Sequence, residues 1–228
     1  MAQAAANRTN WFAIWVSVAV VAVVAVVIAL VVWMNNSATS PGTPPSGSGI
    51  DQSTGAVVVG SGEQTLDTYV DFMCPICNQF EKTYGPEILD LVNKGTITLN
   101  IHPIAILDRY SQGAQFSTRS ANAMYCVAEK SPDAAVPFMQ AMFAKQPQEN
   151  SPGLTDAEIL DIAKSVGVTG IDSCVNDQTY KQFVASMTDM TPVQPGQTGI
   201  ATPTIAINGE TIANSKIPAA GSFASLFK

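Results

Sequence analysis

The sequence predicts an α/β fold, with a βαβ half, a helical insertion at about residues 110–190 and a ββα half, preceded by one N-terminal transmembrane helix. Three observations predict it. An uncharged apolar run near the N-terminus is long enough to cross a bilayer. Alternating and helical periodicities follow one another in that order along the chain. A pair of cysteines separated by two residues stands where the second strand gives way to a helix.

The apolar run covers residues 11–34, which carry no charge and one polar side chain, Ser17. About 20 apolar residues span a bilayer as a helix. Trp11, Trp15 and Trp33 lie near the two ends of the run, where indole rings favour the membrane interface. The alternative is a cleaved signal peptide, but its apolar region is normally about 7–15 residues long. We therefore expect a retained anchor in the lipid bilayer.

The orientation of this anchor follows from the basic residues. Arg8 and the N-terminal amine precede the run, and no Lys or Arg follows it before Lys82. Positive charge stays on the cytoplasmic side, so residues 1–10 are expected in the cytoplasm and the remainder outside. The predicted localisation is the cell membrane, single-pass, with the folded domain in an oxidising compartment where disulfides persist.

The rest of the chain is predicted to be a tether and one domain. Residues 35–54, rich in Ser, Gly, Pro, Thr and Asn, are predicted to form a flexible linker. Residues 55–228 are enough for one domain with a sizeable core. From residue 51 onward the chain has 18 acidic and 10 basic residues, a net charge of −8. This balance argues against nucleic acid as a partner, because phosphate binding needs a basic face.

The first half of the domain has the periodicities of a βαβ unit. A short apolar run at residues 57–59 and alternation at residues 66–72 predict two strands. Apolar residues then recur every three or four positions over residues 80–91, which predicts a helix that Gly85-Pro86 kinks or briefly breaks. Alternation at residues 97–101 predicts a third strand, parallel to the second.

The insertion and the second half follow. Helical spacing and start signals predict helices at residues 120–130, from Pro132 with Ser131 as N-cap, from a capping box at residues 155–158, and over residues 171–190. A hairpin is predicted from residues 204–207 and 211–213 across Asn208-Gly209, with a short helix at residues 219–227.

The Cys74-Pro75-Ile76-Cys77 motif carries the chemistry. Two thiols at this spacing can close a small disulfide ring. The macrodipole and the free N–H groups of a helix start stabilise negative charge there. A thiolate is the form that attacks and leaves in disulfide exchange. The motif therefore predicts that Cys74 is an exposed, reactive sulfur and that Cys77, one turn into the helix, resolves it.

Three stretches together resemble the DsbA-like thiol:disulfide oxidoreductases of the thioredoxin superfamily, particularly the membrane-anchored forms of Gram-positive bacteria. They are residues 69–77 (YVDFMCPIC), 102–108 (HPIAILD) and 199–209 (GIATPTIAING). The resemblance covers residues 55–228. It implies a thioredoxin-like fold in which Cys74 and Cys77 are catalytic and Cys77 is buried.

The resemblance also implies a substrate site. Thr202-Pro203 would be a cis peptide facing the cysteines, whose exposed backbone could pair with an extended substrate segment as an added strand. The substrate cysteine would then lie against Cys74, and Pro75 and Ile76 complete the predicted substrate-binding residues. The ordinary alternative for Thr202-Pro203 is a trans turn at the start of a strand.

Two positions depart from the family's pattern, and one further residue is a candidate for catalysis. Ile76 stands where many relatives have His, which removes one source of thiolate stabilisation and predicts a weaker oxidant. Thr68 stands where a buried carboxylate is common, and strand alternation directs Asp67 and Asp71 away from its face, which argues against a carboxylate proton relay. His102, the only histidine, is not expected to be catalytic.

Cys126 and Cys174 complete the four cysteines, which allow three connectivities. If Cys74 pairs with Cys77, these two pair with each other, and the resemblance supports such a structural bridge. Closing a loop of about 49 residues stabilises by roughly 4 kcal/mol in the chain-entropy model. The alternative is a second redox pair that relays electrons, but neither cysteine stands in a reactive motif. A zinc site is not expected, because structural sites pair two short-spaced motifs, and no cofactor is predicted.

The predicted function is that of a membrane-tethered, extracytoplasmic oxidase, which gives disulfides to exported proteins with reduced cysteines. The resemblance implies that a quinone-linked membrane oxidase of the DsbB or vitamin K epoxide reductase type accepts its electrons. Two alternatives remain: a reductase or isomerase of the same fold, and a non-catalytic module that holds peptides in the Thr202-Pro203 groove. A known type of isomerase needs a dimerisation module, and holding alone does not require Cys74 and Cys77.

Overall fold

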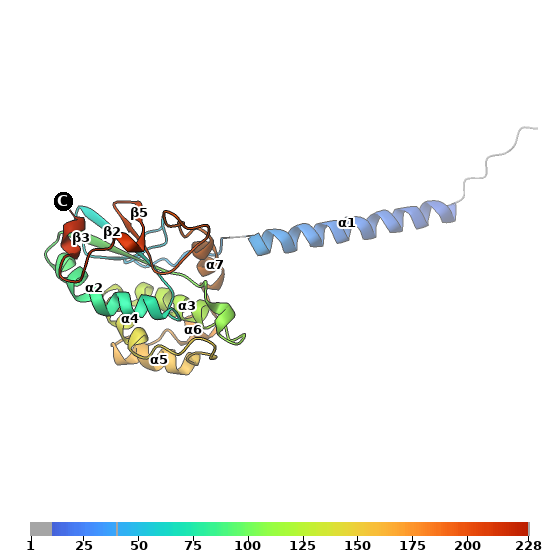
Figure 1. Cartoon of the computed structure of the whole chain (residues 1–228). Helices are drawn as coiled ribbons and strands as arrows, with labels where there is room; N and C mark the ends of the chain where they lie inside the picture. Colours follow the sequence, from blue (N-terminus) through green and yellow to red (C-terminus); the bar gives the residue numbers. More distant parts are fainter. Residues whose placement is uncertain (1–10, 40, 228) are drawn as a thin grey trace, which may run out of the picture. The chain divides into compact units, whose positions relative to one another are not determined.

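The computed structural model describes residues 11–39 and 41–227, and the chain divides into two units, Met1–Ser40 and Pro41–Lys228 (Figure 1). Arg8 and the rest of the predicted cytoplasmic segment, residues 1–10, lie outside the described residues. The orientation inferred from Arg8 therefore stays a prediction.

The first unit contains one helix, α1 (Trp11–Thr39), drawn in blue in Figure 1. Its segment Ile14–Val32, 19 residues long, has the length and apolar composition of a membrane span, and none of that segment is buried. Among the described residues no other helix meets the same test. α1 is thus compatible with a single-pass anchor, and it continues through residues 35–39, where a flexible linker was predicted.

The second unit is built on a five-stranded sheet with the order β1-β3-β2-β4-β5. β2 pairs with β3 in parallel and with β4 antiparallel, and the two outer pairs are antiparallel. The strand bounds are Val57–Val59 (β1), Gln64–Val70 (β2), Ile97–Pro103 (β3), Thr204–Ile207 (β4) and Glu210–Ile212 (β5). The predicted βαβ unit and C-terminal hairpin are confirmed, and central β2 leads directly into the cysteine motif.

The helices confirm the predicted insertion between the third and fourth strands. α2 follows β2 and runs without a break through Gly85 and Pro86. The insertion is gathered around α3, whose residues 116–128 are all buried. The helix bounds are Pro75–Asn93 (α2), Phe116–Lys130 (α3), Ala135–Ala144 (α4), Asp156–Ser165 (α5), Asp172–Asn176 (α6) and Lys181–Asp189 (α7).

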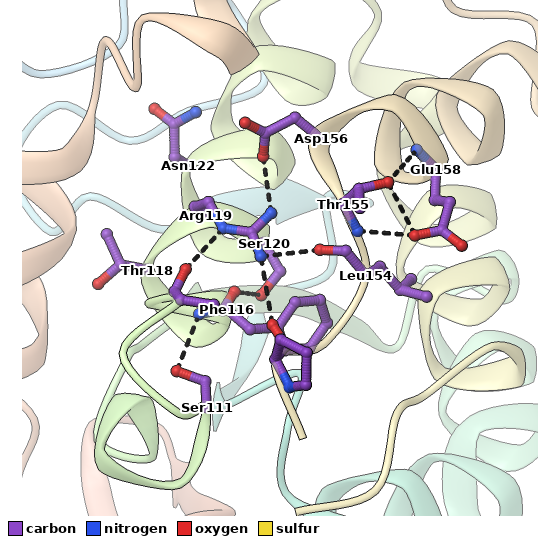
Figure 2. Close-up of polar contacts among 12 residues, drawn as sticks. Ser111, Phe116, Thr118, Arg119, Ser120, Asn122, Leu154, Thr155, Asp156 and Glu158 are labelled. Atoms are coloured by element: carbon purple, nitrogen blue, oxygen red, sulfur yellow. Dashed lines mark hydrogen bonds and ion pairs between the residues drawn. The ribbon is translucent and has the colours of Figure 1, made fainter. Parts of the chain in front are cut away.

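The helix termini confirm one sequence signal and correct two others. The capping box is present: the Thr155 hydroxyl accepts the Glu158 N–H, and the Glu158 carboxylate accepts the Thr155 N–H (Figure 2). Ser131 precedes a short 3₁₀ turn and makes no side-chain capping bond. The predicted C-terminal helix at residues 219–227 is wrong, because Gly221 takes a left-handed conformation and leaves only a 3₁₀ turn, Phe223–Leu226.

The flexible linker predicted at residues 35–54 is also wrong from residue 41 onward. Residues 41–56, here called the strap, lie against the insertion. Both the N–H and the hydroxyl of Ser46 donate to Glu129 Oε1 on α3, at 3.0 and 2.7 Å. A Cβ placed on Gly47 would lie 2.6 Å from Glu129 Cα, so this glycine permits close approach rather than flexibility. Ile50 is buried in the core.

Candidate active site

Residues 71–74, here called the reactive turn, join the carboxyl end of β2 to the first turn of α2. Cys74 is the N-cap of α2, with extended backbone angles, and its sulfur accepts the Cys77 N–H at 3.4 Å. Pro75 follows at the first helical position, where the missing N–H costs nothing and the fixed φ suits a helix. The sequence Cys-Pro therefore places a sulfur where a helix start usually has an oxygen acceptor.

The loop before β4 brings a second element to the cysteines. The Thr202-Pro203 peptide is cis, as the resemblance implied. The Cys74 sulfur lies 3.5 Å from the Thr202 carbonyl oxygen, and the Cys77 sulfur lies 3.0 Å from Thr202 Oγ1. Gln194 fixes the loop by donating to the Pro203 carbonyl at 2.9 Å. Residues more than 120 positions apart in the chain are thus brought together.

The Thr202 hydroxyl contacts both the Cys77 sulfur and the central strand β2. It donates to the Tyr69 carbonyl of β2 at 3.1 Å. The same oxygen lies 3.0 Å from the Cys77 sulfur, a contact in which either atom can be the donor. Burial raises the pKa of Cys77, and this contact partly offsets that effect.

The electrostatics of the two cysteines differ in direction. The hydrogen bond from the Cys77 side chain lowers the pKa of Cys74, and the N–H groups of Cys77 and Ile76 act in the same direction, against the effects of burial and of the Asp71 charge. Burial raises the pKa of Cys77, and the neighbouring Cys74 raises it further. Cys74 is therefore the more acidic of the two thiols and Cys77 the less acidic.

The prediction that Cys74 is exposed is wrong for this reduced state. Cys74 is 4% exposed and Cys77 1%. The N-cap position turns the Cys74 sulfur back onto the first turn of α2, and the Thr202 carbonyl lies on its other side. The accessible residues of the motif are Pro75 and Ile76, and Ile76 is 58% exposed.

A groove of about 240 Å³ runs beside the motif. It contains two of the predicted substrate-binding residues, Ile76 and Pro203. Its other lining residues are uncharged: Gln79, Phe80, Thr83, Tyr84, Asn214 and Ile217. The structure thus brings Ile76 and Pro203 together on the surface, beside the buried cysteines.

A buried carboxylate does lie beside the cysteines, and the prediction about Asp71 is corrected. β2 ends at Val70, so strand alternation does not extend to Asp71, which is fully buried. Its carboxylate accepts the N–H groups of Met73 and Leu107, each at 2.9 Å. Burial raises the pKa of Asp71 to about 6. Thr68, within β2, is buried as well.

His102 lies in a different environment. Its Nε2 is 3.0 Å from Asp67 Oδ1, and its ring stacks on Tyr69 with centroids 4.2 Å apart. These three residues line a cavity of about 390 Å³ whose lining includes no cysteine. The expectation that His102 is not catalytic remains a prediction.

Cys126 on α3 and Cys174 on α6 form a disulfide, with Cα atoms 6.0 Å apart and a sequence separation of 48. Asn122 donates to the Cys174 carbonyl at 3.2 Å and accepts the Tyr180 N–H at 2.7 Å. The bridge therefore lies inside the helical insertion, in a hydrogen-bonded setting. Its contribution to stability remains a prediction.

Sequence reasoning missed two polar residues near the motif, Gln146 and Asn78. Gln146 donates to backbone carbonyls of the reactive turn, and Asn78 donates to Gln146. Gln146 stands in a polar loop with no motif of its own, so no local signal could have identified it. Only the folded chain places it against the turn.

Comparison with known proteins finds a thioredoxin family model and relatives named as disulfide-forming proteins. A family model described as thioredoxin matches residues 53–222. The crystal structure of reduced DsbA from Mycobacterium tuberculosis has a TM-score of 0.62 and 29% sequence identity, covering 75% of this chain and 96% of that one. The disulfide bond formation protein D of Bacillus subtilis is 23% identical over 151 residues, 66% of this chain and 65% of that protein.

A third relative is much longer than this chain. The serine/threonine-protein kinase PknE of Mycobacterium tuberculosis is 35% identical over 107 residues, which are 45% of this chain. The matched region spans only 19% of the length of PknE.

Proposed function

Because the chain belongs to the thioredoxin family and its domain is of the DsbA type, we propose that it is a membrane-tethered thiol:disulfide oxidoreductase that acts through Cys74 and Cys77. One observation carries the proposal. Cys74 sits at the N-cap of α2, 3.5 Å from the Thr202 carbonyl, with Cys77 buried one turn further on. This geometry favours one thiolate and one thiol, which is what directional exchange requires.

The exchange begins with the Cys74–Cys77 disulfide and a reduced substrate. A substrate thiolate attacks the Cys74 sulfur, a mixed disulfide forms, and the Cys77 sulfur leaves and takes a proton. A second substrate thiolate then attacks the substrate sulfur of the mixed disulfide, and Cys74 leaves as a thiolate. The substrate gains a disulfide, and the protein holds the two electrons as a dithiol.

The direction of exchange follows from the stability of the reduced form. A thiolate stabilised at a helix N-terminus makes the dithiol more stable and the disulfide more oxidising. We therefore favour an oxidase over a reductase or isomerase. Ile76 provides no positive charge, so we expect a weaker oxidant than relatives with His at this position.

The substrates of this reaction would be exported proteins with reduced cysteines. An extended substrate segment would pair with the backbone at Thr202 and place its flanking side chains in the groove lined by Ile76 and Pro203. Pro75, exposed at the start of α2, would border the same segment. The uncharged lining of the groove supports a broad rather than a charge-selective choice of substrate.

The cellular setting is also part of the proposal. α1 would anchor the chain in the membrane, with the domain on the extracytoplasmic side, as the position of Arg8 before the apolar run favours. A quinone-linked membrane oxidase of the DsbB or vitamin K epoxide reductase type would accept the electrons. Anchoring both proteins in one membrane would raise their effective concentration.

Oxidation of a reduced, unfolded protein by the full-length chain in detergent tests the proposal. We expect oxidation by the wild type, none by Cys74→Ala, and trapped mixed disulfides with Cys77→Ala. The reduction potential of the Cys74–Cys77 pair should lie well above about −270 mV, toward −120 mV. A value near −270 mV would favour the reductase, and full activity of Cys74→Ala would favour a module that only holds peptides.

A further inference from the structure

One side chain of the helical insertion bonds to the backbone on both sides of Met73 in the reactive turn. Gln146, two residues after α4 ends, donates through Nε2 to the carbonyl oxygens of Phe72 and Cys74, each at 2.9 Å. Its Oε1 accepts the Asn78 Nδ2 group at 2.9 Å. The amide of Gln146 therefore bridges the turn before α2 and the first turn of α2.

Gln146 is itself held firmly. Asn78 also donates to the Phe143 carbonyl at 2.9 Å, which ties the end of α4 to α2. The loop after Gln146 is fixed at its far end by Arg119 of α3, which is 9% exposed. Arg119 donates to the Leu154 carbonyl and to Asp156 Oδ1, each at 2.7 Å (Figure 2). The loop that carries Gln146 is thus anchored to two helices.

We propose that Gln146 is a positioning residue for thiol–disulfide exchange, which holds Cys74 in the N-cap conformation that directs its sulfur to the Cys77 N–H. The inference rests on the proposed function. It adds that the helical insertion, through this one amide, controls the reactivity of a cysteine that belongs to the thioredoxin core.

The physical reason lies in the length of the bond that stabilises the sulfur. The Cys74 sulfur receives the Cys77 N–H at 3.4 Å, and a small rotation of the Cys74–Pro75 peptide would lengthen this contact further. The Cys74 carbonyl belongs to that peptide, and it accepts both Gln146 Nε2 and the helical N–H of Asn78. Two bonds on one carbonyl fix the plane of the peptide, and removing the Gln146 bond leaves the plane with one restraint.

A purely structural brace would also use such bonds, so the test needs a readout of reactivity. We would compare wild type, Gln146→Met and Gln140→Met in the full-length protein. Methionine keeps the length of the side chain but cannot donate. Gln140 is a matched control because it is exposed on α4 and its one side-chain hydrogen bond in the described structure is to Glu81, at 3.5 Å.

For Gln146→Met we expect a rise in the pH at which Cys74 becomes reactive toward iodoacetamide, and a fall of about fivefold in the exchange rate at pH 7, the factor expected for one lost hydrogen bond. Gln140→Met should match wild type in both. A Gln146→Met protein that is folded and keeps the wild-type alkylation profile overturns the inference, even if its melting temperature falls.

If Gln146→Met does not fold, Asn78→Ala provides a milder test. This variant keeps Gln146 and removes the donor to both Gln146 Oε1 and the Phe143 carbonyl. We expect a shift of the same sign of about twofold, and an unchanged alkylation profile overturns the inference. A wild-type protein that alkylates normally but exchanges no disulfides would refute the proposed function, while the shift between variants would still decide the role of Gln146.

Discussion

The strap and the reactive turn are both short segments without regular structure, and both are held by polar side chains of the insertion. Ser46 of the strap bonds to Glu129, and the turn at residues 71–74 bonds to Gln146. The sequence locates the turn, whereas its composition predicts a flexible linker where the strap lies. A spacing of two cysteines has a stereochemical meaning at a helix start, but a Gly- and Ser-rich composition fits both a loose tether and a close contact.

The largest expected effect concerns α3, which carries both Cys126 and the strap's partner Glu129. Replacing Cys126 and Cys174 by Ser together should lower the free energy of unfolding by roughly 4 kcal/mol in the chain-entropy model. Denaturant unfolding of the oxidised proteins measures it, and hydrogen exchange should show the strap loosening more than the turn. Equal stability of variant and wild type would remove the structural role of the bridge.

The next effect concerns the turn and is dependent on pH. An aspartate in an unfolded chain titrates near 3.9, and burial raises the pKa of Asp71 to about 6. The folded state thus holds this proton more tightly, so stability is lost as the pH rises from about 4 to about 6 and stays lower above that. The loss is about 3 kcal/mol for Asp71 alone.

The variant Asp71→Asn has no ionisable group at this position, so it tests the loss of stability that ionisation of Asp71 causes. Between pH 4 and pH 7, the free energy of unfolding of the variant should rise relative to wild type by about 3 kcal/mol. Asp177→Asn, at an exposed site, is the control and should follow wild type. Parallel curves for Asp71→Asn and wild type would show that the carboxylate is not buried in solution.

A smaller effect is expected at the strap. In Gly47→Ala the new Cβ would meet the backbone of Glu129, so the strap must move away at a cost of about 1–3 kcal/mol. Limited proteolysis should then cleave within residues 41–50 faster than in wild type. Ser48→Ala, exposed on the same segment, is the control. Cleavage at the wild-type rate would support the prediction of a flexible linker instead.

The smallest effect concerns the loop that faces the turn. Thr202→Val removes the hydroxyl that lies 3.0 Å from the Cys77 sulfur. Loss of a bond of about 1 kcal/mol in the reduced form should lower the reduction potential by about 20 mV. Equilibration with glutathione measures the potential. A potential that rises would mean that the hydroxyl stabilises the disulfide instead.

Some features of the fold can be predicted from the sequence, and others depend on contacts that only the folded chain makes. The strands and the insertion were predictable because apolar periodicity reports directly on burial. Asp71 was misplaced because alternation was extended one residue beyond the end of β2. Gln146 could not be predicted, since its partners lie more than 70 positions away. Gly221 interrupts the predicted C-terminal helix by its left-handed conformation, which composition does not specify.

The central claim is that the reduced protein holds a thiolate at Cys74 and a thiol at Cys77. With Cys126 and Cys174 joined, these are the two free thiols, so residue-resolved alkylation across a pH series tests the claim directly. We predict that Cys74 reacts first, with a pKa below the ordinary thiol value of about 8.5, while Cys77 stays unmodified. Prior reaction of Cys77, or an ordinary thiol profile at Cys74, would contradict the account.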